Sequence, residues 1–185
     1  MPAIVSMLRA VNVGGHNKLP MAGLRALYAS LGLHNPQTYV QSGNVVFLTA
    51  EKNLDRLARR IELAIEQKFG VHTDVILRTV DELKNVVKRN PFASRPEVHP
   101  GKLLVTFLAA DPDRDAQANL RRMKPGPEET HLIGRELYIY FPNGAGQSRL
   151  STAALGKALQ TPGTARNWNS VTKLLEIALN LKPLP

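Results

Sequence analysis

The order of the predicted elements indicates an α+β fold made of two similar modules. Residues 3–78 alternate strand and helix patterns in the order β-α-β-β-α-β, and the chain after residue 101 repeats β-α-β-β-α. The stretch between them, 89–101, holds three prolines and is the best candidate for a domain boundary. Hairpins combined with split β-α-β units are typical of the ferredoxin-like fold, whose sheets are mostly antiparallel. We therefore predict two ferredoxin-like βαββα(β) modules packed together, residues 1–90 with a linker helix and residues 91–185 with the C-terminal helices.

The first module is predicted from the spacing of its apolar residues and from the glycines and prolines between them. Pro20 suits the first turn of a helix whose apolar residues recur at i, i+3, i+4 and i+7 until Gly32. A second amphipathic helix is closed by Gly70. Thr79 and Glu82 form the capping-box pattern that starts a short linker helix. The predicted elements are strands at 3–8 and 74–78, a hairpin at 38–48, and helices at 20–31 and 54–69.

The second module has the same kinds of signal, with one ambiguous region near the C-terminus. Thr164 could cap the last helix, which would place Arg166 and Asn167 in its first turn. Asp111 and Pro112 have the character of a helix start. The predicted elements are a strand at 102–109, a helix from 111, a hairpin at 130–141 with its turn at Gly134-Arg135, a helix near 150–159 and the last helix.

Composition excludes several classes of protein. Hydrophobic residues make up 43% of the 185 residues, which is enough for a core, and cysteine is absent, so disulfides, thiolate catalysis and cysteine zinc sites are excluded. The N-terminus lacks the profile of a secretory signal, and no apolar run approaches the roughly 20 residues of a membrane span. The five histidines are scattered, and no nucleophile-elbow motif is present. We expect a cytoplasmic protein without metal, cofactor or membrane contact.

The net charge of +9 is concentrated at the two ends of the chain. Residues 1–50 hold three basic residues and no acidic one, and residues 145–185 hold five basic residues and one acidic residue, Glu176. The long middle is nearly balanced, so the basic bias belongs to the ends. One interpretation is a bias towards solubility. The other is that the ends meet in space and bind an anion.

The first candidate site is the loop that follows the first strand, with the sequence LRAVNVGGHNKLP. Gly14 and Gly15 let backbone N–H groups approach a ligand, and the dipole of the next helix points towards the loop. Lys18 beside a helix N-terminus is unfavourable unless an anion is bound. His16 is the one general acid–base candidate within a motif. A plain glycine turn is the alternative, because the loop matches neither a Walker A nor a dinucleotide-binding motif.

Two further motifs carry neutral polar and basic side chains. The sequence QSGN, with Gln41, Ser42, Gly43 and Asn44, lies at a predicted hairpin turn, and TARNWNSVTK precedes the last helix. Each motif also has a purely structural explanation. QSGN can be a plain hairpin turn, and Trp168 has the spacing of a core residue. The candidate ligand-binding residues are Arg9, Asn12, Gly14, Gly15, Asn17, Lys18, Gln41, Ser42, Asn44, Arg166, Asn167 and Trp168.

These motifs resemble a bacterial family catalogued as domain of unknown function 1697. The resemblance rests on LRAVNVGGHNKLPMAGLRAL, on TYVQSGNVVF, and on SRLSTAALGKAL followed by TARNWNSVTKLLEIA, in that order. Ala10 stands where that family typically has glycine. The resemblance implies an α+β fold with ferredoxin-like halves and the same motif residues, Lys173 included. It implies no reaction.

Three functions remain open at this point. The first is a binding module for a phosphate-bearing ligand, either a nucleotide or a nucleic acid. Tyr138 and Tyr140, on one face of a strand, keep RNA possible, but the first strand has no aromatic residue, which disfavours sequence-specific base stacking and not binding through the nucleic-acid backbone. The second is a small enzyme acting on a phosphorylated or acidic metabolite, in which Arg9 with Asn12 or Asn44 would resemble an acyl-phosphate hydrolase by analogy alone. The third is a protein-interaction domain that uses an exposed sheet edge. The sequence leaves the oligomeric state open.

Overall fold

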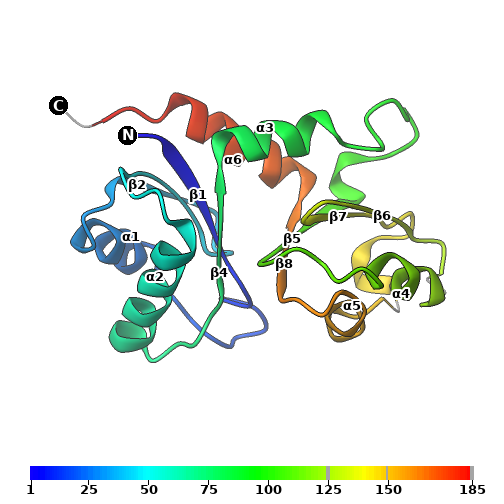
Figure 1. The fold of residues 1–185 in the computed structure, drawn as a ribbon, viewed down its shortest axis with the longest axis horizontal. Helices are drawn as coiled ribbons and strands as arrows, with labels where there is room; N and C mark the ends of the chain where they lie inside the picture. The colour runs from blue at the N-terminus through cyan, green and yellow to red at the C-terminus, as the bar shows by residue number, and fades with distance from the viewer. Residues whose placement is uncertain (124–125, 149, 184–185) are drawn as a thin grey trace. The chain divides into compact units, whose positions relative to one another are not determined.

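The chain forms two compact units in the computed structural model, which describes residues 1–123, 126–148 and 150–183 (Figure 1). The first unit comprises Met1–Asn85 together with the C-terminal segment from Lys173, and the second comprises Val86–Thr172. The divisions therefore fall within two helices, α3 (Val80–Lys88) and α6 (Trp168–Asn180). The predicted boundary at residue 90 stays a prediction.

The first unit is a four-stranded antiparallel sheet with two helices on one face. The strand order is β2-β3-β1-β4, the order of a ferredoxin-like module. The elements are β1 (Ala3–Leu8), α1 (Met21–Ser30), β2 (His34–Tyr39), β3 (Asn44–Leu48), α2 (Leu54–Phe69) and β4 (Val75–Thr79).

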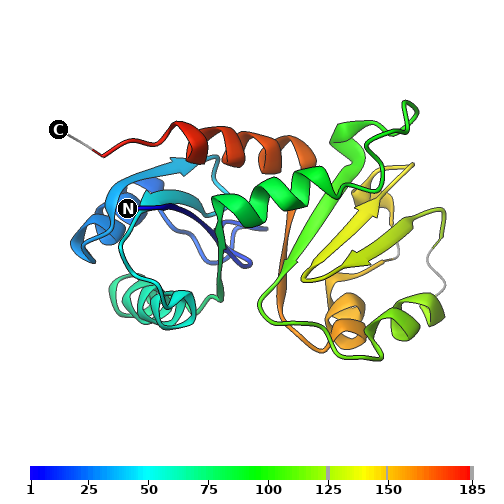
Figure 2. The same cartoon turned by 45° about the horizontal axis from the view of Figure 1, so that its top comes forward.

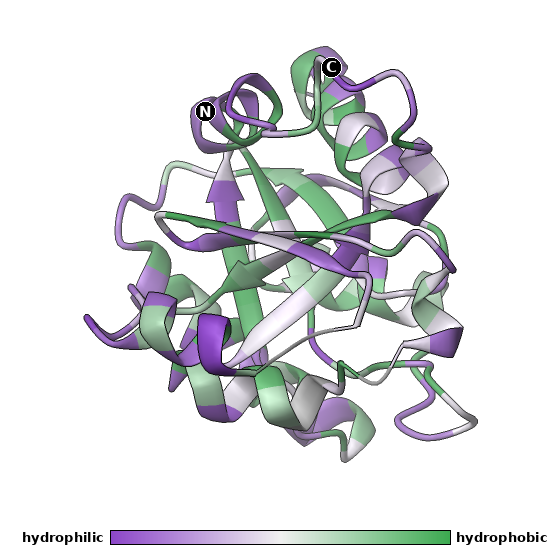
Figure 3. Ribbon diagram, turned by 90° about the vertical axis from the view of Figure 1, so that its right-hand side faces the viewer, coloured by the Kyte–Doolittle hydropathy of each residue, from purple (hydrophilic) through white to green (hydrophobic). Residues whose placement is uncertain are grey.

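The core of the first unit lies between the sheet and helices α1 and α2. Ile4 and Leu8 of β1 pack in one cluster with Tyr28 of α1 and Ile61 of α2. Ser6, the polar residue of this face, lies with its Oγ 2.8 Å from the Tyr28 hydroxyl, so each buried hydroxyl has a partner. Burial raises the pKa of Tyr28 and keeps it neutral. In Figure 3 hydrophobic colouring occurs in strands and in parts of the helices, while hydrophilic colouring is frequent along the loops.

The second unit repeats this architecture. Its sheet has the order β6-β7-β5-β8, again antiparallel, and α4 and α5 lie together on one face (Figure 2). None of the described helices in either unit is long and apolar enough to span a membrane. The elements are β5 (Leu103–Leu108), α4 (Ala116–Arg122), β6 (Glu129–Ile133), β7 (Glu136–Tyr140), α5 (Thr152–Leu159) and β8 (Gly163–Asn167), with 3-10 turns at Pro100–Lys102 and Ala145–Gln147. The predicted α+β class with two ferredoxin-like modules and a C-terminal helix is confirmed.

The expected start of the last helix was wrong. Gly163–Asn167 forms strand β8, which pairs with β5, and α6 begins only at Trp168. Thr164 therefore does not cap the helix; Asn167 Oδ1 accepts from the Asn169 N–H instead, at 3.0 Å. All five residues of β8 are paired with residues of β5, and the backbone hydrogen bonds of this pairing outweigh a local helix signal. Helix α4 also starts later than predicted, at Ala116 rather than at Asp111.

The two units correspond in their hydrogen bonds as well as in their element order. Leu8 N–H donates to the Gly43 carbonyl, and Leu108 N–H donates to the Arg135 carbonyl, both at 2.9 Å. Val5 lies between Val46 and Arg78 in the first sheet, and its counterpart Val105 lies between Tyr138 and Arg166 in the second. Each sheet thus carries a buried arginine at the same position of its fourth strand. Arg78 is 1% exposed and Arg166 6%.

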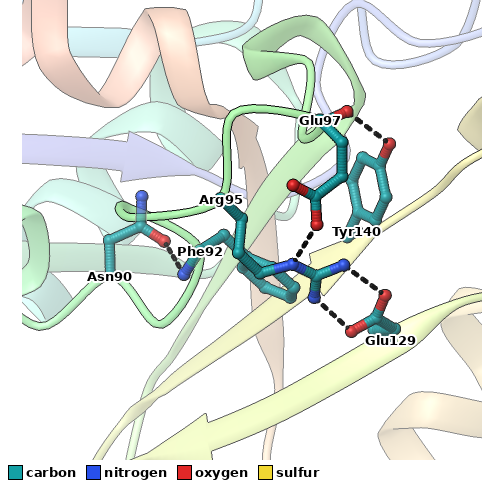
Figure 4. A network of polar contacts seen from close by, with 6 residues as sticks. All are labelled: Asn90, Phe92, Arg95, Glu97, Glu129 and Tyr140. Carbon is teal, nitrogen blue, oxygen red and sulfur yellow. Dashed lines mark hydrogen bonds and ion pairs between the residues drawn. The ribbon is translucent and has the colours of Figure 1, made fainter.

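The proline-rich stretch after α3 is anchored to the second sheet by an ionic network (Figure 4). Arg95 binds both carboxylate oxygens of Glu129, at 2.6 and 3.1 Å, and its Nε donates to Glu97 at 2.6 Å. The guanidinium also lies 5.5 Å from the centre of the Phe92 ring. The Tyr140 hydroxyl donates to the Glu97 carbonyl at 3.4 Å. This segment is therefore an ordered part of the second unit.

The network predicts a specific acid sensitivity. Arg95 holds the pKa of Glu97 and of Glu129 below the usual range. Groups with a depressed native pKa stabilise the fold above their unfolded pKa, and that stability is lost as the pH falls below about 4.3. We expect Glu129→Gln to remove part of the decrease in thermal unfolding midpoint that the wild type undergoes between pH 6 and pH 3.

The matched control is Asp111→Asn, because Asp111 is an exposed carboxylate with no ion pair to any described residue. This variant should keep the wild-type pH dependence. An unchanged pH dependence in Glu129→Gln would contradict the assignment.

Candidate functional site

The loop between β1 and α1, residues 9–20, is held in one conformation by the side chain of Asn12. Its amide nitrogen donates to the carbonyls of Leu19, at 3.0 Å, and Gln41, at 2.7 Å. Its Oδ1 accepts from the Leu19 N–H at 2.7 Å. A single amide therefore connects both ends of the loop to the neighbouring β2–β3 turn. Asn12 and Gln41, which come from two of the predicted motifs, are brought together by this contact.

The same loop contains an unusual number of left-handed residues. Gly14 and Gly15 have φ values of 57° and 80°, and the non-glycine residues Ala10, Asn12 and Asn17 lie between 50° and 54°. Asn17 donates its amide to the Ala10 carbonyl at 3.0 Å, which helps to hold that conformation. Such backbone is unfavourable for residues with a Cβ and persists only where surrounding contacts enforce it.

The QSGN motif forms the turn against which this loop packs. Gly43 has a φ of 74°, and a Cβ at this position would come within 2.5 Å of Val11 Cγ2 and 2.8 Å of Leu8 Cβ. Asn44 is fully buried, and its amide donates to Ser42 Oγ at 2.9 Å and to the Tyr39 carbonyl at 3.1 Å. Val40, exposed and β-branched, has a φ of 51° in the same turn. The motif is thus both a close-packed turn and one wall of the loop.

The two basic residues of the loop, Arg9 and Lys18, differ in whether an acidic residue pairs with them. Arg9 forms an ion pair with Asp74, at 3.0 Å, so the acid that residues 1–50 lack is supplied by the residue before β4. Lys18 is exposed and has no ion pair or hydrogen bond to any described residue. Helix α1 begins after Pro20 with no side-chain cap and no acidic residue in its first turn. Lys18 and the uncapped N–H groups of α1 therefore both lie at the C-terminal end of the loop.

Asp74 is a site residue that was not predicted from the sequence. The signal that could have found it is the topology, because β4 lies antiparallel beside β1 and the residue before β4 therefore adjoins the residue after β1. The adjoining Thr73 also contributes, since its hydroxyl donates to the Arg9 carbonyl at 2.7 Å.

The second unit provides an internal comparison for this loop. The equivalent connection from β5 to α4, residues 109–115, is shorter and contains Asp111, Asp113 and Asp115 with a single arginine. Each connection leaves the central strand of its own sheet in the same way: Arg9 N–H donates to the Asp74 carbonyl at 3.0 Å, and Ala109 N–H donates to the Pro162 carbonyl at 2.9 Å. The fold therefore requires neither the length nor the positive charge of the first loop.

The third predicted motif lies in the second unit. Arg166 is buried in β8 and donates to Thr164 Oγ1 at 2.7 Å and to the Ala165 carbonyl at 2.9 Å. Burial lowers its pKa to about 10. Asn167 donates to the Gly101 carbonyl at 2.9 Å, and Trp168 is half-buried. Because Arg166 lies in a strand, the expectation of a positive charge at a helix N-terminus was wrong for this residue.

The aromatic residues considered for base stacking are unavailable. Tyr138 is 1% exposed and donates its hydroxyl to the Val86 carbonyl at 2.8 Å. Tyr140 and Phe47 are buried as well. Stacking of RNA bases on these strand residues is therefore excluded, while contacts to phosphate groups remain open. Among the described residues, no group of three or more side chains could hold a metal ion.

The tight packing at Gly43 predicts a measurable cost. Gly43→Ala and Gly15→Ala both place a Cβ on left-handed backbone, which costs about 1–2 kcal/mol. Nothing lies within 4 Å of a Cβ at Gly15, whereas the Cβ at Gly43 overlaps Val11 and Leu8. We expect Gly43→Ala to lose a further 1–3 kcal/mol, roughly, from overpacking, measured by urea unfolding. Equal losses in the two variants would contradict this packing.

Comparisons with known proteins agree with the fold and with two of the three motifs. The family described as "Protein of unknown function (DUF1697)" matches residues 1–138, a range that includes the loop after β1 and the QSGN turn. None of the curated proteins matches the chain. A solved structure of a conserved bacterial protein from Streptococcus pneumoniae is similar, with 20% sequence identity and a TM-score of 0.69, over 96% of this chain and 98% of that one. At that identity the likeness supports the fold alone. The family match covers most of the sequence and confirms the resemblance seen in the motifs: the chain belongs to the DUF1697 family of proteins of unknown function.

Proposed function

We propose that the β1–α1 loop of the first unit binds an anionic, phosphate-bearing ligand. The observation that carries this proposal is the contrast between equivalent loops: residues 9–20 are basic and acid-free, whereas residues 109–115 are shorter and acidic. Since the two loops make equivalent connections in their two sheets, the special composition of the first requires a reason other than folding. An anionic ligand is such a reason.

The groups for holding an anion are the backbone of the loop and two cations. The N–H groups of Gly14 and Gly15 donate to no described residue, and the first N–H groups of α1 have no capping side chain. Lys18 would contribute an unpaired charge, and Arg9 would contribute a guanidinium whose second edge is not used by Asp74. Phosphate is the anion best suited to several N–H donors and a lysine at a helix N-terminus.

Asn12, Asn17 and Asn44 have positioning roles in this proposal. The amides of Asn12 and Asn17 bond to backbone carbonyls and hold the loop, and the Asn44 amide bonds to Ser42 and to the Tyr39 carbonyl within the adjoining turn. An acyl-phosphate hydrolase arrangement would need one of these amides to face the substrate. Binding is therefore the function that we favour over turnover.

Removal of the unpaired charge tests the proposal directly. Purified protein is screened by thermal shift against inorganic phosphate, pyrophosphate, nucleotides and short DNA and RNA at low salt. A ligand at 100 times its Kd adds about 2.7 kcal/mol to stability. We expect a phosphate-bearing ligand to raise the Tm, and Lys18→Gln to raise its Kd roughly 10-fold, because one charge-assisted hydrogen bond is worth about 1.5–3 kcal/mol.

Arg59→Gln is the matched control, since Arg59 is exposed on α2 of the same unit and also lacks an ion pair to any described residue. This variant carries the same net charge as Lys18→Gln and should bind like the wild type. Absence of a shift with every anion, or equal losses in both variants, would contradict the proposal.

The salt dependence of binding separates a small ligand from a polyanion. For a nucleic acid that contacts several cations, log Kd rises linearly with the logarithm of the salt concentration. On a duplex the slope is about 0.9 for each phosphate contacted. A mononucleotide held only through this loop should show a slope no larger than about 2. A polyanion whose slope does not decrease in Lys18→Gln would not be bound by this loop.

A further inference from the structure

The outer edges of the two equivalent sheets are protected differently. Strand β2, at the edge of the first sheet, contains Pro36, has a register shift between His34 and Gln37, and holds Asn35 at a φ of 47°. These are devices that prevent another strand from pairing with an edge. Strand β6, at the equivalent edge of the second sheet, has no proline, and all five of its residues keep regular register with β7. The second edge therefore lacks these devices.

The backbone of β6 presents hydrogen-bonding groups to that open side. The Leu132 carbonyl accepts a hydrogen bond from Gln117 Nε2 at 2.8 Å, so it points away from β7 and towards α4. Backbone groups alternate sides along an antiparallel strand, and Thr130 therefore turns its N–H and C=O the same way. Outside the sheet, no described residue binds the backbone of Thr130. The edge offers an incoming strand at least one free donor and one free acceptor.

A polar hollow lies beside this edge. It has a volume of about 230 Å³ and is lined by Gln117, Leu120 and Arg121 of α4 and by residues 130–133 of β6. None of the described residues that line the hollow is acidic. Arg121 is exposed and forms no ion pair or hydrogen bond with any described residue. The hollow therefore combines a strand edge with one unpaired positive charge.

Glu129, the acidic residue at the start of β6, is held by an arginine. Glu129 is bound by both terminal nitrogens of Arg95, in the network of Figure 4. This ion pair fixes the start of the strand and holds the Glu129 carboxylate against Arg95, at the opposite end of β6 from the hairpin turn. His131 is also restrained, because its ring packs edge-on against Phe92, with 5.2 Å between ring centres. These contacts restrain the first half of β6.

We propose that an extended acidic peptide segment of a partner protein adds to the second sheet as a further strand along β6, with one carboxylate bound by Arg121. Main-chain hydrogen bonds to Thr130 supply affinity that does not depend on sequence, and the hollow beside α4 accepts alternate side chains. The arginine supplies the preference for acidic segments. This surface is separate from the anion-binding loop, and each can fail without the other.

The test uses the full chain and fluorescein-labelled octapeptides measured by fluorescence anisotropy. The probe alternates Glu and Val and ends in a free carboxylate; the control peptide replaces every Glu by Lys. We expect the acidic peptide to bind at least 10-fold more tightly than the basic one. Methylation of the amide nitrogens on one edge of the peptide should abolish binding, while methylation on the other edge should leave it unchanged.

Two pairs of protein variants locate the binding surface. Thr130→Pro removes the outward N–H without loss of a bond to β7, and should weaken binding at least 10-fold, whereas Thr130→Val should bind within 2-fold of the wild type. Arg121→Glu should lose the acidic peptide and gain affinity for the basic one, whereas Arg122→Glu should change neither by more than a few fold. If Thr130→Pro fails to fold, as judged by circular dichroism, the methylated peptides and the Arg121 pair decide the question.

Absence of binding, or binding that is indifferent to methylation and to Arg121→Glu, would overturn the proposal. Analytical sedimentation of the unliganded chain tests whether the β6 edge pairs with a second copy of the same chain. A dimer that Thr130→Pro dissociates would show that the edge pairs with a second copy of this chain, and that outcome would also overturn it.

Discussion

Each sheet depends on a central strand that is buried on both faces and paired on both sides. All six residues of β1 are buried, and the strand pairs with β3 on one side and with β4 on the other. Burial on two faces requires an almost wholly apolar strand, and the hydrogen-bonded ladders on both sides fix its register. The end of β1 then determines what can meet there. The residues after Leu8 adjoin the β2–β3 turn and the start of β4, which is where the candidate site lies.

The repeated architecture separates what the fold needs from what it does not. Both units use the same strand order, the same hydrogen bond from the last residue of the central strand, and a buried arginine on the fourth strand. They differ in the loop after the central strand and in the outer edge. The first unit has an elaborate basic loop and a protected edge, and the second has a short acidic loop and an open edge. These differences are the reason for assigning an anion to one unit and a peptide to the other.

Local conformational strain and unpaired charge occur together in the first unit. The left-handed residues of the loop and of the adjoining turn are enforced by the hydrogen bonds of Asn12 and Asn17 and by the close packing of Gly43. A protein that only needed to connect β1 to α1 could do so with fewer residues, as the connection from β5 to α4 does. Backbone in sparsely populated conformations of this kind is typical of binding and active sites.

The sequence by itself determined the α+β class, the two modules, most of their elements and the basic character of the first loop. Those features depend on apolar periodicity, on glycine and proline, and on charge, all of which are local. Only the tertiary structure decided that Gly163–Asn167 is a strand, since its pairing with β5 prevails over the local capping signal at Thr164. It also decided that Asp74 pairs with Arg9, that Asn12 joins two motifs, and that Arg166 is buried in the second unit. These outcomes depend on contacts between residues far apart in the chain, which the spacing of residues along one segment does not encode.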